Sequence, residues 1–264
     1  MTLQEFKTKH GLETVKIFGV DGHLYTEPIN VKLNINKNIT LEDLKDKSKL
    51  SIIPYFDGYV MTKDGIISPF GIKLSGHWNE GFALDFHTIS STPSGVDSNG
   101  RTIWDTKRPP IAEDLYHLKY WKEQYRVATI AKPTANFISQ YKSKWELDLI
   151  IPIPPSDMTR GFQPVYEMAK KIGQLTSLLV DFSALKKIKP TSQLKEIEDP
   201  DNRKEILKDA FSINVNALIG KNVLLFDDLY RSGETLNAVC DIIINKAKAK
   251  NVYVLTITKT RSKR

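Results

Sequence analysis

The segment from residue 222 to residue 239 constrains the fold more than any other part of the chain. Four apolar residues, Val223–Phe226, are followed by two carboxylates, Asp227 and Asp228, and then by a short loop that contains Gly233. An uninterrupted apolar run of this length is typical of a strand buried in a parallel sheet. Apolar residues then recur at helical spacing: Leu236, Val239, Cys240 and Ile243. We therefore predict an α/β fold in which a buried strand ends at the acid pair and a loop leads into a helix.

Each part of this segment has a chemical use. In α/β proteins, ligands bind at the carboxyl ends of parallel strands, where such a loop lies. Backbone N–H groups of the loop and of the helix N-terminus attract anions, and Gly233 lets a phosphate approach closely. Ser232 and Thr235 add hydroxyl donors, while the two carboxylates accept from ligand hydroxyls and hold a divalent cation through water. The segment predicts a site for a ligand with a phosphate and vicinal hydroxyls.

The residues from Val223 to Thr235, Val-Leu-Leu-Phe-Asp-Asp-Leu-Tyr-Arg-Ser-Gly-Glu-Thr, resemble the phosphoribosyl pyrophosphate motif of type I phosphoribosyltransferases. The resemblance implies a core with a parallel sheet flanked by helices, and Mg²⁺ as cofactor. It also implies that Asp227 and Asp228 are catalytic residues that hold the ribose, with Mg²⁺ bound through the ligand or with the help of these two carboxylates. The residues implied to bind phosphoribosyl pyrophosphate around its 5′-phosphate are Leu229, Tyr230, Arg231, Ser232, Gly233, Glu234 and Thr235.

A second strand, loop and helix come earlier in the chain. The apolar run Leu147–Ile153 is a strand candidate, and a helix is expected over residues 165–175. The loop between them contains Pro155, Ser156 and Arg160, and a guanidinium matches the oxygens of a phosphate. We expect these three residues to bind the pyrophosphate end of the donor, with Arg160 as a catalytic residue.

Residues from about 106 to 264 resemble the ComF family of type I phosphoribosyltransferases. The resemblance lies in Leu115–Tyr120, Ile151–Pro154, Arg160–Gln163, Thr191–Leu194, Arg203, Leu207, Ala210–Phe211, the acid-pair motif and the apolar run Val252–Thr258, which looks like the closing strand. ComF proteins often begin with a cysteine zinc module, whereas Cys240 is the single cysteine of this chain. We therefore expect a different N-terminal region and disfavour the family's role in DNA uptake.

Residues 1–105 are expected to form a β-rich α+β domain, which serves as a hood over the site or as an acceptor or partner module. The phosphoribosyltransferase-like domain then covers residues 106–264. Strands are expected at Thr14–Val20, Ile29–Ile35, Leu50–Phe56 and Tyr59–Thr62, with a short helix from Leu41 and a hairpin turn at Lys63–Gly65. Residues 93–102 are expected to be a loop that ends this domain, because they are rich in Ser, Gly, Asn and Asp.

Two helices are expected early in the second domain, over Ile111–Trp121 and Val127–Tyr141, although Pro133 makes the start of the second uncertain. Within residues 76–92, His77, Asp85 and His87 form a candidate acceptor pocket. Asp85 and His87 are two residues apart and so share a face of a strand. These polar residues equally suit hydrogen bonding around an aromatic core, and no known metal-binding spacing is present.

The resemblance implies that an unidentified acceptor attacks the sugar and that pyrophosphate leaves. In the related 6-oxopurine enzymes, an acid three residues after the second carboxylate serves the base. Arg231 stands there, which disfavours hypoxanthine or guanine as acceptor. Two alternatives stay open. One is a non-catalytic regulatory protein that binds phosphoribosyl pyrophosphate or a nucleotide, and the other is a nucleic-acid-associated ComF-like factor.

The net charge of +7 comes from the C-terminal end. Residues 244–264 contain seven basic residues and no acidic one: Lys246, Lys248, Lys250, Lys259, Arg261, Lys263 and Arg264. We expect weak, sequence-independent nucleic-acid binding there, with Arg261 and the residues after it free to move beyond the last strand. The single cysteine and the short apolar runs predict a cytoplasmic protein without membrane association, and a homo-oligomer is expected.

Overall fold

The computed structural model describes residues 71–155, 157, 160–189, 206–207 and 209–261, and the backbone of four earlier strands. These strands are β1 (Lys16–Phe18), β2 (Leu24–Tyr25), β3 (Tyr59–Thr62) and β4 (Gly65–Ile67). They form an antiparallel sheet in the order β2-β1-β3-β4, and the pairing of Thr62 with Gly65 confirms the expected hairpin. The expected strands at 29–35 and 50–56 and the helix from Leu41 lie outside the described residues.

The central sheet has six strands in the order β10-β9-β13-β14-β6-β5. Their bounds are β5 (Ile72–Lys73), β6 (Glu80–Phe86), β9 (Leu149–Pro152), β10 (Leu179–Val180), β13 (Asn222–Tyr230) and β14 (Asn251–Lys259). All neighbours are parallel except β5 and β6. This arrangement confirms the predicted α/β class, and it places the acid-pair strand β13 between β9 and β14.

Strand β13 is longer than expected. The apolar run predicted a strand that ends at Phe226, but pairing with β14 continues through the acids to Tyr230, opposite Lys259. The neighbouring strand supplies backbone partners over this whole length, so the ladder continues although the side chains become polar. The acid pair therefore lies on a regular strand, and the loop begins only at Arg231.

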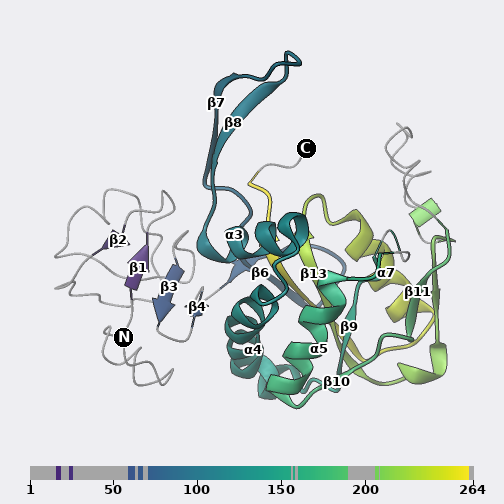
Figure 1. Ribbon diagram of the computed structural model, residues 1–264. Coiled ribbons are helices and arrows are strands. Elements are labelled where there is room, and N and C mark those ends of the chain that lie inside the picture. Colours follow the sequence, from purple (N-terminus) through teal and green to yellow (C-terminus); the bar gives the residue numbers. More distant parts are fainter. Residues whose placement is uncertain are drawn as a thin grey trace.

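Helices cover both faces of the sheet (Figure 1). Helix α3 (Pro110–Tyr116), the π-helical turn η1 (His117–Trp121), α4 (Arg126–Trp145) and α5 (Pro164–Thr176) pack on one face, around Ile150, Leu224 and Leu255. Helix α7 (Glu234–Asn245) packs on the other face, and its predicted apolar residues are buried there. The expected helices are thus confirmed, and Pro133 is buried inside α4.

Strands β5 and β6 precede residue 105, the expected boundary between two domains, and yet they belong to the central sheet. The core of the protein therefore begins by Ile72. A sequence pattern cannot show this pairing, because β6 lies beside β14, which follows it by about 170 residues.

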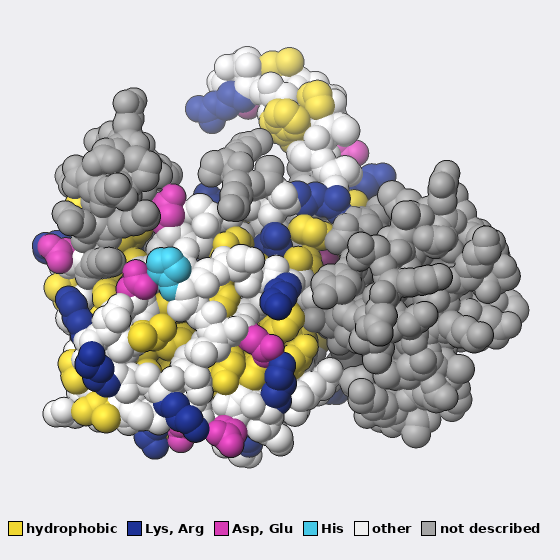
Figure 2. All heavy atoms as spheres, turned by 180° about the vertical axis from the view of Figure 1, so that it is seen from behind, with side chains coloured by type: hydrophobic (Ala, Val, Ile, Leu, Met, Phe, Trp, Pro, Cys, Tyr) yellow, Lys and Arg dark blue, Asp and Glu magenta, His cyan; other side chains and the backbone are white. Residues whose placement is uncertain are grey.

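The expected loop at 93–102 is partly wrong. Residues up to Val96 belong to β7 (Ser90–Val96), which pairs with β8 (Thr102–Lys107) in a hairpin that projects from the body (Figures 1 and 2). Asp97 Oδ1 accepts from the backbone N–H groups of Asn99 and Arg101, which forms the turn. Loop-forming residue types here occupy exposed strands, which are joined by backbone pairing and by side-chain hydrogen bonds such as the one between the Ser91 and Thr106 hydroxyls.

Three further short elements are β11 (Leu185–Lys187), which pairs with β12 (Phe211–Ile213), and a 3-10 turn at Val215–Ala217. No helix in the part of the chain that the structure describes is long and apolar enough to cross a membrane.

Candidate functional site

The acid pair lies at the carboxyl end of the central strand. The backbone N–H of Asp228 donates to Asp227 Oδ1 at 2.8 Å, which fixes the first carboxyl group against the strand. Burial of this carboxyl group, together with the charge of Asp228, raises the pKa of Asp227 well above its usual range. The pair therefore resists carrying two negative charges unless a cation or a hydrogen-bond donor approaches.

One cation already lies at the pair. Lys119 Nζ, from the π-helical turn η1, is 2.7 Å from Asp228 Oδ2. Burial alone would lower the pKa of Lys119, but the charges of Asp228 and Asp227 and the hydrogen bond to Asp228 outweigh it, so the pKa is raised and the amine stays protonated. This contact was not predicted from the sequence. A lysine in a helical segment gives no local signal for a partner more than a hundred residues later.

The loop after β13 turns sharply into α7. Gly233 has a left-handed φ of +81°, and an added Cβ would lie 2.7 Å from the Tyr230 hydroxyl. Only glycine adopts this conformation readily, so the turn depends on it. No side-chain hydrogen bond caps the N-terminus of the helix, and the N-terminus of a helix attracts an anion. Ser232, Glu234 and Thr235 are each half-buried at this turn.

The loop after β9 is less closely bound to the sheet. Pro155 is half-buried, and Ser156 lies outside the described residues. Arg160 Nε donates to Asp157 Oδ2 at 3.2 Å, and its side chain is 70% exposed. Among the residues that the structure describes, no hydrogen bond or ion pair joins Arg160 to the acid pair. Arg160, the residue predicted to bind pyrophosphate, thus faces solvent.

The three acceptor candidates are not all brought together. His77 Nδ1 contacts Asp241 of α7 at 2.8 Å and precedes the start of β6, whereas His87 follows its end. A strand of this length separates the two histidines by roughly 20 Å. Asp85 is buried and accepts from the backbone N–H of Phe86. The structure places His87 and Asp85 beside the end of β14, and His77 at the other end of β6.

His87 is held by Thr258, with 3.1 Å between Nδ1 and the Thr258 hydroxyl. Burial, together with the positive charges of Arg108 and Lys119, lowers the pKa of His87. The imidazole is therefore neutral near pH 7 and serves as a hydrogen-bond partner rather than a cation. No group of three or more His, Cys, Asp or Glu residues that would hold a metal ion occurs in the described part of the chain.

A cavity of about 180 Å³ lies next to the β13 loop on its β14 side. Its lining residues are Lys73, Leu74, Ser75, Tyr230, Arg231, Lys259, Thr260 and Arg261, four of which are cations. The expectation that Arg261 moves freely is wrong, because its Nε donates to the Thr88 carbonyl at 3.0 Å and its guanidinium lies over Phe86. Lys263 and Arg264 lie outside the described residues. The positive charge of Arg261, just after β14, is thus held in place by contacts with the folded protein.

Two comparisons with known proteins bear on this site. No curated protein matches the chain. The family model of the phosphoribosyl transferase domain matches residues 122–264, which include β9, β13, α7 and β14, and therefore both strand-to-helix loops and the acid pair. Because this match covers more than half of the chain, the protein belongs to the phosphoribosyl transferase domain family.

Proposed function

We propose that the protein binds phosphoribosyl pyrophosphate with Mg²⁺ and transfers phosphoribose to an acceptor, with release of pyrophosphate. The observation that carries the proposal is the acid pair on the central strand, followed three residues later by the loop whose left-handed Gly233 opens helix α7. This order places hydroxyl acceptors beside an anion site, as a sugar phosphate requires. Membership of the phosphoribosyl transferase domain family supports the reaction class.

In this proposal each described element has one role. Asp227 and Asp228 accept from the ribose hydroxyls, and the N–H groups at the start of α7 bind the 5′-phosphate. Arg160 turns from Asp157 to the pyrophosphate, which is a small movement for an exposed side chain. Mg²⁺, if bound with the donor beside Asp227 and Asp228, would neutralise negative charge on the leaving group. Catalysis rests mainly on positioning the sugar and stabilising the charge that leaves.

We place the acceptor on the β14 side of the acid pair. Strands β9 and β14 flank β13 on opposite sides, so the proposed pyrophosphate loop and the cavity also lie on opposite sides of it. Displacement at a carbon centre is easiest when nucleophile and leaving group lie opposite each other. The four cations of the cavity favour an acceptor that carries a carboxylate or a phosphate group. His87, neutral and close to Arg108, adds a hydrogen-bond partner at the edge of this region.

Within the phosphoribosyl transferase domain family, we propose that this protein is related to the ComF proteins, on the basis of the sequence resemblance. We do not extend this proposal to a shared function. The rival function is a regulatory protein that binds the sugar donor without turnover. Both share the donor site, and they differ in whether an acceptor reacts.

Calorimetry with phosphoribosyl pyrophosphate and Mg²⁺ tests the donor site. The wild type should bind, and the Asp227→Asn/Asp228→Asn variant should lose at least about tenfold in affinity, because two charge-assisted hydrogen bonds are removed. Asp105→Asn, which removes an exposed carboxylate from β8, is the matched control and should bind as the wild type does. Equal binding by the double variant and the wild type would refute the donor assignment.

Pyrophosphate release then separates the enzyme from the regulator. Acceptors are tested in pairs that differ in one acidic group, such as nicotinate with nicotinamide and orotate with uracil. The proposal expects release with an acidic member and a much lower rate with its neutral partner. Donor binding without release for any base, amine, nucleoside or acid would favour the regulatory function.

A further inference from the structure

The ammonium group of Lys119 lies at the acid pair, against Asp228. Its contact with Asp228 is short, at 2.7 Å, and partly withdrawn from water, since the two side chains are 31% and 14% exposed. We propose that Lys119 is a built-in counter-ion of the acid pair, which takes the position of a directly coordinated divalent cation at Asp228. The inference rests on the proposed function only in assigning Asp228 to the donor site.

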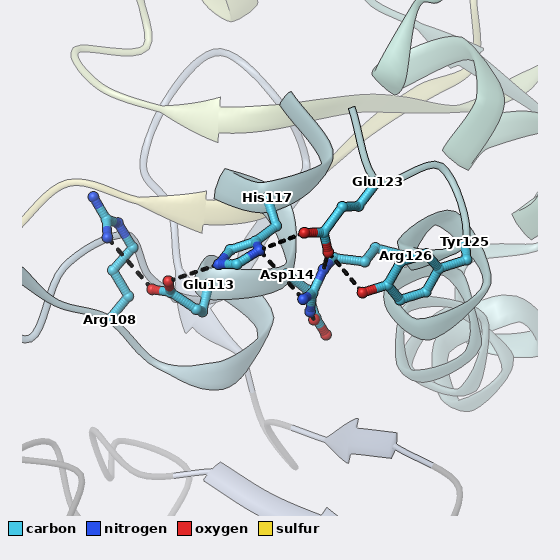
Figure 3. Close-up of polar contacts among 7 residues, drawn as sticks. All are labelled: Arg108, Glu113, Asp114, His117, Glu123, Tyr125 and Arg126. Carbon is cyan, nitrogen blue, oxygen red and sulfur yellow. Dashed lines mark hydrogen bonds and ion pairs between the residues drawn. The ribbon is translucent and has the colours of Figure 1, made fainter. Parts of the chain in front are cut away.

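The position of Lys119 is fixed from the opposite side of the same turn by His117. Both ring nitrogens of His117 contact carboxylates: Nε2 lies 3.2 Å from Glu113 Oε1, and Nδ1 lies 3.1 Å from Glu123 Oε1 (Figure 3). Glu113 belongs to α3 and Glu123 follows η1. The histidine therefore ties the beginning of the π-helical turn to the segment that leaves it.

Further contacts extend this network of His117 and its two glutamates into α4. Glu123 Oε2 accepts from Tyr125 Oη and from Arg126 Nε, each at 2.6 Å, and Arg126 also pairs with Asp114 (Figure 3). At the α3 end of the network, Arg108 donates to Glu113 Oε2 at 3.4 Å. The network thus spans both ends of the corner between α3 and α4, and it holds the turn that presents Lys119.

Burial holds the turn as well. Leu118, between the braced histidine and the lysine, is fully buried in the core beneath α3 and α4. A π-helical turn is uncommon and occurs frequently at functional sites, since it re-aims side chains relative to a regular helix. With Leu118 inward and His117 bound on both nitrogens, Lys119 has little freedom to leave the acid pair.

Electrostatics explain why an ammonium here excludes a directly bound metal. Hard divalent cations prefer several oxygen ligands, and no group of three or more His, Cys, Asp or Glu residues that could hold a metal occurs among the described residues. Lys119 uses one oxygen of Asp228 and repels a second cation at short range. A divalent ion would instead be held by the oxygens of the ligand. Lys119 precedes residue 122, where the family match begins, so the matched domain does not include it.

Manganese alone, added to the protein without a sugar donor, tests this inference. Bound and free Mn²⁺ are distinguished by electron paramagnetic resonance. We expect Lys119→Met to bind Mn²⁺ at least about tenfold more tightly than the wild type, because a repelling charge is removed. Lys119→Arg should resemble the wild type, since it keeps the charge. The gain should disappear in the Lys119→Met/Asp228→Asn double variant.

Lys170→Met, which removes an exposed lysine from α5, is the matched control and should leave Mn²⁺ binding unchanged. Equal Mn²⁺ affinity in the wild type and Lys119→Met would overturn the inference, as would a gain that survives in the double variant. Because no donor is present, these outcomes are independent of whether the protein binds phosphoribosyl pyrophosphate.

A second measurement needs no substitution of Lys119. An amine-reactive reagent modifies only the neutral form of lysine, and mass spectrometry reports each site. In Asp228→Asn, Lys119 loses its counter-ion and should react several times faster than in the wild type, whereas Lys170 should react at the same rate in both proteins. Equal reactivity of Lys119 in the two proteins would show that the ion pair does not hold it.

Discussion

The two strand-to-helix connections that flank the proposed donor site differ in how firmly they are held. Only Arg231–Gly233 separates β13 from α7, whereas the connection between β9 and α5 runs from Ile153 to Gln163. In the short connection, Tyr230 packs beneath Gly233, and its carbonyl accepts from the N–H of Thr260 beyond β14. The short connection is thus anchored to the end of β14 and packed on Tyr230.

The longer connection is bound mainly to itself. Ile153 N–H still donates to Phe226 of the sheet, but after it the Gln163 side chain donates to the carbonyls of Asp157 and Arg160. Arg160 in turn pairs with Asp157. The proposed phosphate site is thus formed in advance by the backbone, whereas the proposed pyrophosphate site would have to be completed by its ligand.

Alanine in place of one glycine in each connection gives the largest contrast. Gly233→Ala should lower the free energy of unfolding by at least about 2 kcal/mol, because it combines a left-handed backbone with a contact at 2.7 Å to the Tyr230 hydroxyl. Gly161 has no neighbouring atom within 4 Å of an added Cβ and no positive φ. Gly161→Ala should be neutral or stabilise by about 0.5 kcal/mol. Urea unfolding measures both, and equal effects would remove the distinction between the connections.

The raised pKa of Asp227 predicts that the free energy of unfolding depends on pH, with an effect of intermediate size. Burial and Asp228 raise the pKa of Asp227 from 3.8 to about 8, so the folded protein binds this proton more tightly than the unfolded chain does. The contribution to stability is therefore largest at low pH and is lost as the pH rises between these two values. Relative to Asp227→Asn, the wild type should lose at least about 1.4 kcal/mol of stability between pH 5 and pH 8.

Urea unfolding at several pH values measures this difference, and Asp105→Asn on the exposed hairpin is the control. Parallel pH profiles of the wild type and Asp227→Asn would mean that the carboxyl group is not withdrawn from water. The acid pair would then lack the electrostatic strain that makes Lys119 necessary.

The short connection was the more predictable of the two from sequence. Its apolar run, acid pair and glycine lie within thirteen residues, so local patterns determine the strand, the turn and the start of α7. The end of β13 was misplaced because the ladder with β14 decides it, and residue types do not. The helices at 111–121 and 127–141 were found for the same local reason.

The partners across the site were not predictable in this way. Lys119 meets Asp228, and β6 meets β14, only through tertiary packing, and one sequence contains no signal of such long-range pairs. The candidate histidines illustrate the limit, because residues 76–92 look like one cluster in sequence. The strand between His77 and His87 carries them to opposite ends. Proximity in sequence indicates a common site only when no extended element intervenes.

A smaller effect is expected in the longer connection. Arg160→Gln should weaken pyrophosphate binding up to about tenfold, because one charge-assisted contact is lost. Its effect on stability should stay within about 0.5 kcal/mol, since the pair with Asp157 is exposed. Asp157→Asn should instead leave pyrophosphate binding unchanged or strengthen it, as it frees the guanidinium. Calorimetry with pyrophosphate and Mg²⁺ measures the affinity of the wild type and of both variants. Undiminished binding by Arg160→Gln would remove Arg160 from the site.

The smallest effect concerns nucleic-acid binding by the basic C-terminal end. The cations there differ in whether the folded protein binds them. Arg261 contacts Thr88 and Phe86, and Lys250 pairs with Glu146. Lys246 and Lys248 are exposed after α7. Binding should be weak and independent of sequence, and its affinity should fall steeply between about 50 and 200 mM salt. The residues after β14 include no aromatic side chain to stack on bases, so charge alone contributes.

Two truncated proteins separate these cations. A version that ends at Arg261 loses Lys263 and Arg264, and the slope of log affinity against log salt should become shallower by at most about 2 if both contact phosphates. A version that ends at Thr260 also loses Arg261, so it should show the added loss of a residue that packs on Phe86, seen as lower thermal stability. Titrations with short single- and double-stranded oligonucleotides measure the slopes. Tight binding that survives high salt, or a preference for one sequence, would contradict a purely electrostatic contact and would favour a nucleic-acid-associated function.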